Sequence, residues 1–156
     1  MPSLVVDASV AIKWFNPAEA LANCANLIRD DYVHGRVDLM VPAFWDYEMV
    51  NGMNKAVARG DLTAEEGRAA VRLILAIQAR RVPLPPPDES YELAQRYQRS
   101  VYDSWYVALA QHVGGEFWTA DRKLYYAMHE SLAFVRWLGD YQSAEAASDK
   151  ENRGGL

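Results

Sequence analysis

The chain has few of the groups that hold small secreted proteins or membrane proteins together. Its single cysteine, Cys24, excludes an intrachain disulfide and a zinc site built from several cysteines. No stretch approaches the roughly 18 uncharged apolar residues that a membrane-spanning helix needs, and the first residues lack the basic segment of a secretory leader. These absences predict a soluble protein of the reducing cytoplasm.

Positive charge is also scarce. Lys and Arg number 16 against 21 Asp and Glu, so the formal net charge is -5. This balance excludes a protein that holds nucleic acid by bulk positive charge alone, although it allows one that recruits a cation for that purpose. The length of 156 residues and the 51% apolar content suit one packed domain. We assign that domain to residues 1–138 and expect residues 139–156 to form a polar, flexible tail.

Short apolar segments alternate with amphipathic helical patterns. The pattern predicts strands over residues 4–6, 38–41, 82–84, 116–119 and 132–137. It predicts helices over residues 8–15, 18–34, 43–59, 63–80, 88–97, 102–113 and 121–128. Such alternation favours an α/β fold, a three-layer α/β/α sandwich around a mostly parallel central sheet.

Four acidic residues stand where a parallel sheet places its functional groups. Asp7 ends the first predicted strand, Asp121 closely follows the fourth, Asp103 opens a helix, and Glu48 lies near the start of the helix after the second strand. Sites in such sheets lie beyond the carboxyl ends of the strands. Carboxylates that share a pocket need compensation, and a hard cation such as Mg²⁺ or Mn²⁺ supplies it. The sequence therefore predicts a metal site.

Each of these acids also has a structural interpretation. The three aspartates precede helical patterns and are placed to cap them, and the glutamate is placed to be a solvated helix residue. Ser9 and Thr119 are interpreted as local hydrogen-bonding residues that are also positioned to support the acids. From the residues alone, both interpretations stay open.

Four segments carry a resemblance to a known family: residues 5–10 (VVDASV), 42–48 (PAFWDYE), 102–110 (YDSWYVALA) and 119–124 (TADRKL). In this order and at these intervals they resemble the PIN domain and, more narrowly, the VapC-type toxins of toxin–antitoxin pairs. The similarity covers nearly the whole chain, and the second half carries its most specific parts.

The resemblance implies a Mg²⁺- or Mn²⁺-dependent endoribonuclease that acts as the toxin of such a pair. It implies that Asp7, Glu48, Asp103 and Asp121 form an acidic cluster that is catalytic and holds one or two ions. It also implies an RNA substrate, a homodimer, and a small antitoxin that occupies a hydrophobic groove and reaches into the site. DNA would then be contacted only through the antitoxin complex.

The chain departs from the family pattern in two places. Ser104 and Trp105 stand where small or polar residues are common, so access to the substrate near Asp103 is expected to differ. After Asp121 the chain offers tyrosines and no further carboxylate, so a fifth acidic ligand of some relatives is missing.

Two other functions remain possible on the sequence. One is a catalytically weak module that binds RNA or the antitoxin and regulates through that complex. Residues proposed to line its partner groove, with core packing as the alternative, are Trp14, Phe15, Val71, Ile74, Leu75 and Ile77. The other is an aspartyl phosphotransferase with Asp7 as nucleophile, although Ser9 stands where one such family requires a second acid. Arg122 and Lys123 are candidate phosphate contacts and equally ordinary exposed charges.

Overall fold

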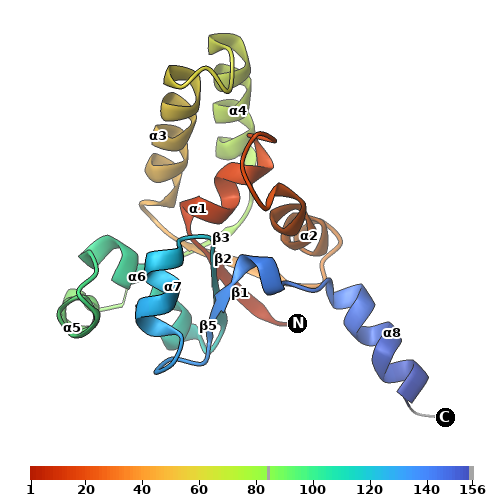
Figure 1. The fold of residues 1–156 in the computed structure, drawn as a ribbon, viewed down its shortest axis with the longest axis vertical. Coiled ribbons are helices and arrows are strands. Elements are labelled where there is room, and N and C mark those ends of the chain that lie inside the picture. Colours follow the sequence, from red (N-terminus) through yellow and green to blue (C-terminus); the bar gives the residue numbers. More distant parts are fainter. Residues whose placement is uncertain (84, 155–156) are drawn as a thin grey trace.

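The structure, a computed structural model, describes residues 1–83 and 85–154, in which strands and helices alternate (Figure 1). The strands are β1 (Ser3–Val6), β2 (Asp38–Pro42), β3 (Arg80–Val82), β4 (Glu116–Thr119) and β5 (Val135–Trp137). The helices before β3 are α1 (Ala8–Ala11), the 3₁₀ turn η1 (Ile12–Trp14), α2 (Ala22–Val33), α3 (Trp45–Ala58) and α4 (Ala64–Ala76). The later ones are α5 (Pro87–Tyr97), α6 (Val101–Val113), α7 (Arg122–Met128), the 3₁₀ turn η2 (Leu138–Asp140) and α8 (Ala144–Gly154).

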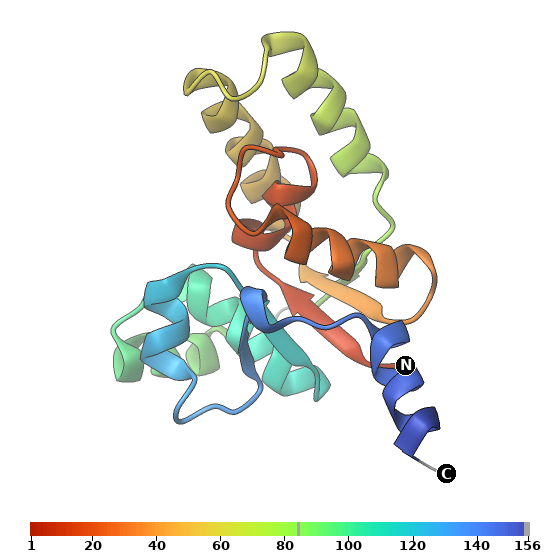
Figure 2. The ribbon, with the colours of Figure 1, turned by 45° about the vertical axis from the view of Figure 1, so that its right-hand side comes forward.

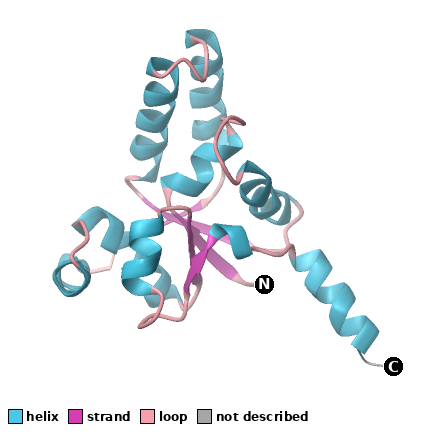
Figure 3. Cartoon of the chain, in the orientation of Figure 1, coloured by secondary structure: helices cyan, strands magenta, loops and turns pink. Residues whose placement is uncertain are grey.

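The described strands form one five-stranded sheet in the order β3-β2-β1-β4-β5, and every neighbouring pair is parallel. The central strand β1 is buried on both faces, as its run Leu4–Val6 predicts. Because crossovers between parallel strands are right-handed, α1 and α2 lie on one side of the sheet and α5 to α7 on the other (Figures 2 and 3). Helix α3 continues from the side of α1, which it contacts. The predicted α/β/α sandwich is confirmed.

The strand order reverses between β1 and β4. From β1 the chain moves outward to β2 and then to β3. It then returns to β4, on the other side of β1, and continues outward to β5. Such a switch point leaves a crevice at the carboxyl ends of the two strands. Helix α6 packs beneath β1, β2 and β4 through buried side chains that include Tyr106 and Leu109, so it fixes the floor of this crevice.

Helices α3 and α4 form a hairpin that extends away from the sheet (Figure 1). Two glycines let its parts approach closely, because an added Cβ on Gly67 would lie 2.7 Å from Val57, and one on Gly52 would overlap Ile12 of η1. The predicted capping box starts α4, since Glu66 N donates to the Thr63 hydroxyl and Thr63 N to the Glu66 carboxylate.

Several predicted boundaries are wrong by up to a turn. Helix α4 ends at Ala76 rather than near residue 80, because Arg80 pairs with Met40 of β2 as the start of β3. The predicted strand over residues 82–84 therefore begins two residues earlier, and Leu84 lies outside the described residues. Helix α2 begins at Ala22 rather than residue 18, after Leu21 in a left-handed conformation with φ of 62°.

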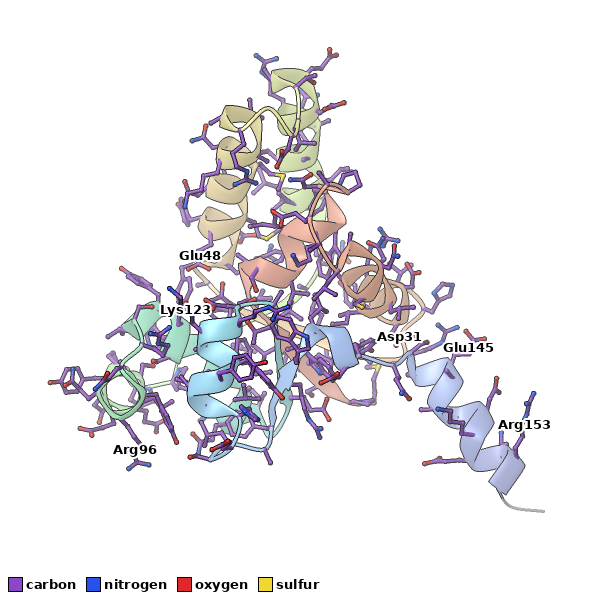
Figure 4. The ribbon with its side chains drawn as sticks, in the orientation of Figure 1. Asp31, Glu48, Arg96, Lys123, Glu145 and Arg153 are labelled. Atoms are coloured by element: carbon purple, nitrogen blue, oxygen red, sulfur yellow. The ribbon has the colours of Figure 1, made fainter. Side chains whose placement is uncertain are left out.

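The last part of the chain is tied to α2 through one buried carboxylate. Asp31 accepts hydrogen bonds from the Tyr141 hydroxyl at 2.7 Å, the Ala144 amide at 2.8 Å and the Ser143 hydroxyl at 3.0 Å, next to Glu145 at the start of α8 (Figure 4). Helix α8 continues away from the body, and none of its described residues is buried.

Within residues 139–156, predicted to be a polar, flexible tail, the structure places the end of η2 and helix α8. Residues 155–156 lie outside the described part, and the domain boundary at residue 138 and the flexibility of the tail stay predictions. In the described residues, no helix is both long and apolar enough to cross a bilayer.

Candidate active site

The four predicted acids come from four different elements that meet at the carboxyl edge of the sheet. Asp7 directly follows β1, Asp121 follows β4, Asp103 lies in the first turn of α6, and Glu48 lies in the first turn of α3. Their charges act on one another: Asp103 and Asp121 raise the pKa of Asp7, Asp121 raises that of Asp103, and Asp103 raises that of Glu48. The fold thus gathers all four into one electrostatic cluster, which we call the acidic cluster.

Asp7 lies deepest in the acidic cluster. Its side chain is 7% exposed, and its carboxylate accepts hydrogen bonds from the hydroxyls of Ser9 and, at 2.7 Å, Thr119. Burial raises the pKa of Asp7 to about 7; the two hydroxyls oppose this rise, and the neighbouring aspartates add to it. Among the described residues, no Lys or Arg side chain hydrogen-bonds to Asp7, so its charge has to be met by a proton or by a cation from outside the chain.

Ser9 and Thr119 connect Asp7 to the loop that carries Asp121. The Ser9 hydroxyl accepts from the amide of Ala120 at 3.1 Å, and the Thr119 hydroxyl accepts from the amide of Asp121 at 3.0 Å. Because both hydroxyls also donate to Asp7, the distance between the ends of β1 and β4 is fixed by hydrogen bonds as well as by strand pairing. The geometry therefore gives both residues the supporting position expected from the sequence.

The capping interpretation applies to one of the three aspartates. Asp121 caps α7, because one of its carboxylate oxygens accepts from the Leu124 amide at 3.2 Å and the other oxygen is left for a second partner. Helix α6 is capped by Ser100, so Asp103 is not its cap. Asp7 precedes α1, but its side chain makes no capping hydrogen bond to that helix. Asp7 and Asp103 thus make no side-chain capping bond that would account for them.

Tyr106 is a site residue that the sequence did not single out. Its hydroxyl donates to the Glu48 carboxylate at 2.7 Å, and its ring is almost fully buried on α6, three residues after Asp103. Burial and the charge of Glu48 raise the pKa of Tyr106 above the usual range, so the phenol keeps its proton and remains a donor. Burial also raises the pKa of Glu48, and the bond from Tyr106 opposes that rise. The sequence signal for Tyr106 was its position three residues after Asp103, which places both side chains on one face of the helix.

The acidic cluster suits a hard divalent cation in donor type and in charge. All four side chains offer carboxylate oxygens, which Mg²⁺ and Mn²⁺ prefer. Burial is the main cause of the raised pKa of Asp7, and the charges of Asp103 and Asp121 add to it. Among residues 1–83 and 85–154, however, no three His, Cys, Asp or Glu side chains are arranged to enclose an ion. The fit is therefore one of chemistry and charge, without a preformed cage.

Aromatic side chains cluster around Trp105, which with Ser104 is the first departure from the family pattern. Trp105 stacks on Phe44 with ring centroids 5.4 Å apart, and Tyr102 meets the Phe44 ring edge-on at 5.6 Å. Ser104 lies on the buried face of α6 and is fully buried. The bulky Trp105 is thus held against Phe44, the residue that precedes α3.

Comparison with known proteins identifies the family. A family model described as PIN domain matches residues 4–129. The chain is 34% identical over 122 residues to Ribonuclease VapC12 of Mycobacterium tuberculosis, covering 78% of this chain and 88% of that protein. It is 28% identical over 127 residues to Ribonuclease VapC3 of Pyrobaculum aerophilum, covering 78% and 91%.

Two solved structures share the fold. PAE2754 from Pyrobaculum aerophilum superposes with a TM-score of 0.63 at 22% identity, over 81% of this chain and 79% of that one. VapC20 of Mycobacterium tuberculosis, described as a toxin that cleaves the sarcin–ricin loop, gives 0.56 at 17% identity, over 80% and 95%. Since the family model spans most of the chain and a relative above 30% identity is covered along most of its length, this protein belongs to the PIN-domain family, as its four motifs predicted.

Proposed function

We propose that the protein is a divalent-metal-dependent endoribonuclease that hydrolyses RNA phosphodiester bonds as the toxin of a toxin–antitoxin pair. The observation that carries this proposal is the buried, uncompensated carboxylate of Asp7 among three further acids at the switch point of the sheet. The ribonuclease names of the two curated relatives support the same activity. The toxin description of VapC20 agrees with it, although that likeness establishes the fold alone.

The side chains divide the work around the cation. Asp7 and Asp103 would be its principal ligands, and Asp121 and Glu48 would complete the set for one or two ions of Mg²⁺ or Mn²⁺. Such a cation lowers the pKa of a bound water and stabilises charge on phosphoryl oxygens. Ser9 and Thr119 orient the Asp7 carboxylate. Tyr106 donates to one oxygen of Glu48 and so fixes the orientation of that carboxylate, which leaves the second oxygen for the cation.

Arg122 and Lys123 are proposed to contact the RNA backbone. Both are exposed on the first turn of α7, directly after Asp121, and Lys123 lies at the end of α7 that is nearer to α3 and Glu48 (Figure 4). Cations there would hold a phosphate beside the acidic cluster without reading its base.

The α3–α4 hairpin offers a surface for the antitoxin. A hollow of about 520 Å³ lies between the two helices, and its apolar lining includes Val50, Met53, Val57 and Val71. Of the residues proposed from sequence, Val71 thus borders the hollow, Ile74 is core, and Leu75 is exposed. We propose that an apolar antitoxin segment binds this hollow, and that the protein is a homodimer in the free or the bound state.

Removal of the metal or of one ligand tests the proposed function. We expect purified protein to cleave RNA with Mg²⁺ or Mn²⁺, to lose cleavage in EDTA, and to lose it as Asp103→Asn, measured on end-labelled RNA in denaturing gels. Asp149→Asn on α8 removes the same charge far from the acidic cluster and should cleave normally. Cleavage that persists in EDTA or in Asp103→Asn would show that the proposed site is wrong. Tight RNA binding without turnover at any metal concentration would favour the regulatory module instead.

Replacing Thr119 by valine should change the pH dependence of cleavage. The Thr119 hydroxyl donates to Asp7 and lowers its pKa, and valine fills the same buried volume without donating. The pKa of Asp7 should rise, so the acid limb of the pH–rate profile should move to higher pH, because Asp7 must be ionised to bind a cation. Thr119→Ser keeps the hydroxyl and should restore the original profile. An unshifted profile in the valine variant would contradict the assigned role of Thr119.

A further inference from the structure

A second pocket opens at the carboxyl edge of the sheet, next to the acidic cluster. It has a volume of about 260 Å³ and lies between α7 and the end of β5. We call it the α7–β5 pocket, and it is lined by Arg122, Tyr125, Tyr126, His129, Trp137 and Asp140. Neither the metal chemistry nor the antitoxin surface uses these side chains.

The α7–β5 pocket lies two strand spacings from Asp7, because β4 stands between β1 and β5. Trp137 is the register partner of Thr119 across the β4–β5 pair, and the hydroxyl of Thr119 donates to Asp7. Neighbouring strands are about 4.8 Å apart. Arg122, on the opposite wall, directly follows Asp121. An RNA strand whose phosphate lies at the acidic cluster can therefore reach this pocket with an adjoining nucleotide.

The walls of the pocket are mostly aromatic. Tyr125 stacks on His129 with ring centroids 4.3 Å apart and contacts Trp137 at 5.7 Å, so these rings hold one another in place. Tyr126, by contrast, is 66% exposed. Exposed aromatic faces held on a rigid support are the usual platforms for unpaired bases, because each base offers a face for stacking whatever its sequence.

The charges around the pocket distinguish a base from a phosphate. Arg122 lines the pocket and lies over the Trp137 ring at 5.4 Å, where its donors suit a phosphate at the mouth of the pocket. Asp140 also lines the pocket. Its carboxylate would repel a phosphate there, whereas it accepts hydrogen bonds from the amino groups of bases. A volume of about 260 Å³ is also below the roughly 300–1,000 Å³ of sites for drug-sized ligands, which suits a single base.

We propose that the α7–β5 pocket binds one unpaired nucleobase of the RNA, adjoining the phosphate at the acidic cluster. The base stacks on Tyr126 and the Trp137 edge of the pocket, and Arg122 holds the linking phosphate. Gly139 is part of this design, because an added Cβ would lie 2.6 Å from the indole nitrogen of Trp137 and displace the ring. The ligand class rests on the proposed ribonuclease function, and the pocket would give that enzyme a base-binding subsite.

Binding measured without cleavage tests this subsite. The probe is a short single-stranded RNA with one 2-aminopurine, titrated into protein inactivated by Asp103→Asn. We expect quenching of the 2-aminopurine at one position of the RNA, and a Kd that rises roughly 5- to 100-fold in Asp103→Asn with Tyr126→Ala, the range that loss of one stacked base gives. Tyr91→Ala removes a similarly exposed tyrosine from α5 and should leave the Kd unchanged. Because both tyrosines are exposed, neither variant is expected to unfold.

Three outcomes would overturn the proposal. Equal Kd values with and without Tyr126→Ala in the Asp103→Asn protein would show that Tyr126 is not a stacking platform. Equal quenching of 2-aminopurine in single-stranded RNA and in a fully paired duplex would show that the pocket does not select an unpaired base. Loss of antitoxin binding in Tyr126→Ala with unchanged RNA binding would assign the pocket to a protein contact. None of these measurements needs catalysis. If the RNA binds as expected but the unsubstituted protein does not cleave it, the proposed function is contradicted and the base pocket is still supported.

Discussion

Replacing Asp7 by asparagine is expected to lower RNA cleavage by roughly 100- to 1,000-fold, the usual effect of removing one preorganised charged group from a catalytic site. Asparagine keeps the shape and one acceptor oxygen, but its amide nitrogen cannot accept from the second of the two hydroxyls, and it cannot supply the negative charge. The rate constant on saturating RNA measures this loss. Cleavage within a few-fold of the parent would remove Asp7 from the catalytic set.

The same substitution should make the metal-free protein more stable. The pKa of Asp7 is 3.8 unfolded and about 7 folded, so the native state keeps a proton that the unfolded state releases. This stability is fully present below about pH 4 and is lost as pH rises through 7. Asparagine stays neutral throughout, so its free energy of unfolding at about pH 8 should exceed that of the parent by about 2–4 kcal/mol.

Urea unfolding in EDTA at about pH 4 and pH 8 measures this difference, which should nearly vanish at the lower pH. Asp149→Asn is the matched control, since it removes an exposed carboxylate from α8. Added Mg²⁺ should stabilise the parent protein by mass action and the Asp7 variant much less. A variant that is less stable than its parent at the higher pH would show that Asp7 is compensated within the chain.

Asp31→Ala should release the C-terminal segment and cost about 2–4 kcal/mol of unfolding free energy. Asp31 is fully buried, and its loss leaves three donors of residues 141–144 and the guanidinium of Arg36 without their acceptor. Burial alone would raise the pKa of Asp31, but these four hydrogen bonds outweigh it and hold the pKa below the usual value. The stabilisation is therefore present above about pH 4 and lost as pH falls through the lowered pKa.

Limited proteolysis followed by mass spectrometry reads out the release, with cleavage expected between η2 and α8 before any cut in the sheet. Asp30→Ala is the control, because Asp30 is the neighbouring residue on α2 and its side chain is 52% exposed. Equal protection of residues 141–154 in both variants would show that Asp31 does not hold this segment.

The fold and the place of the acidic cluster followed from the sequence because both depend on local patterns. A buried apolar run ending at Asp7 and a second one ending at Thr119 define two parallel strands, and parallel strands bring their carboxyl ends to the same edge. The end of α4 did not follow, because the apolar helical pattern runs on through Ile77. The helix stops where Arg80 pairs with β2, which is a tertiary contact.

The contacts that the sequence concealed join distant residues. Glu48 meets Tyr106 across 58 positions, and Asp31 meets Tyr141 across 110. A helical pattern shows only that each of these residues lies on a given face, so it cannot name the partner. The sequence also left Asp121 as either a helix cap or a site residue, whereas its two oxygens allow both roles at once.

The central position of β1 has a consequence for the newly made protein. Strand β1 can pair with its second neighbour, β4, only after residue 116 has been synthesised, since Leu4 pairs with Glu116. Pairings between such distant segments form late and slowly. Asp7 and Asp121 therefore cannot meet until most of the chain has been synthesised, and an unfinished chain carries the first three acids without an assembled centre. The proposed cleavage of RNA, which uses all four acids, would therefore arise only after synthesis has passed Asp121.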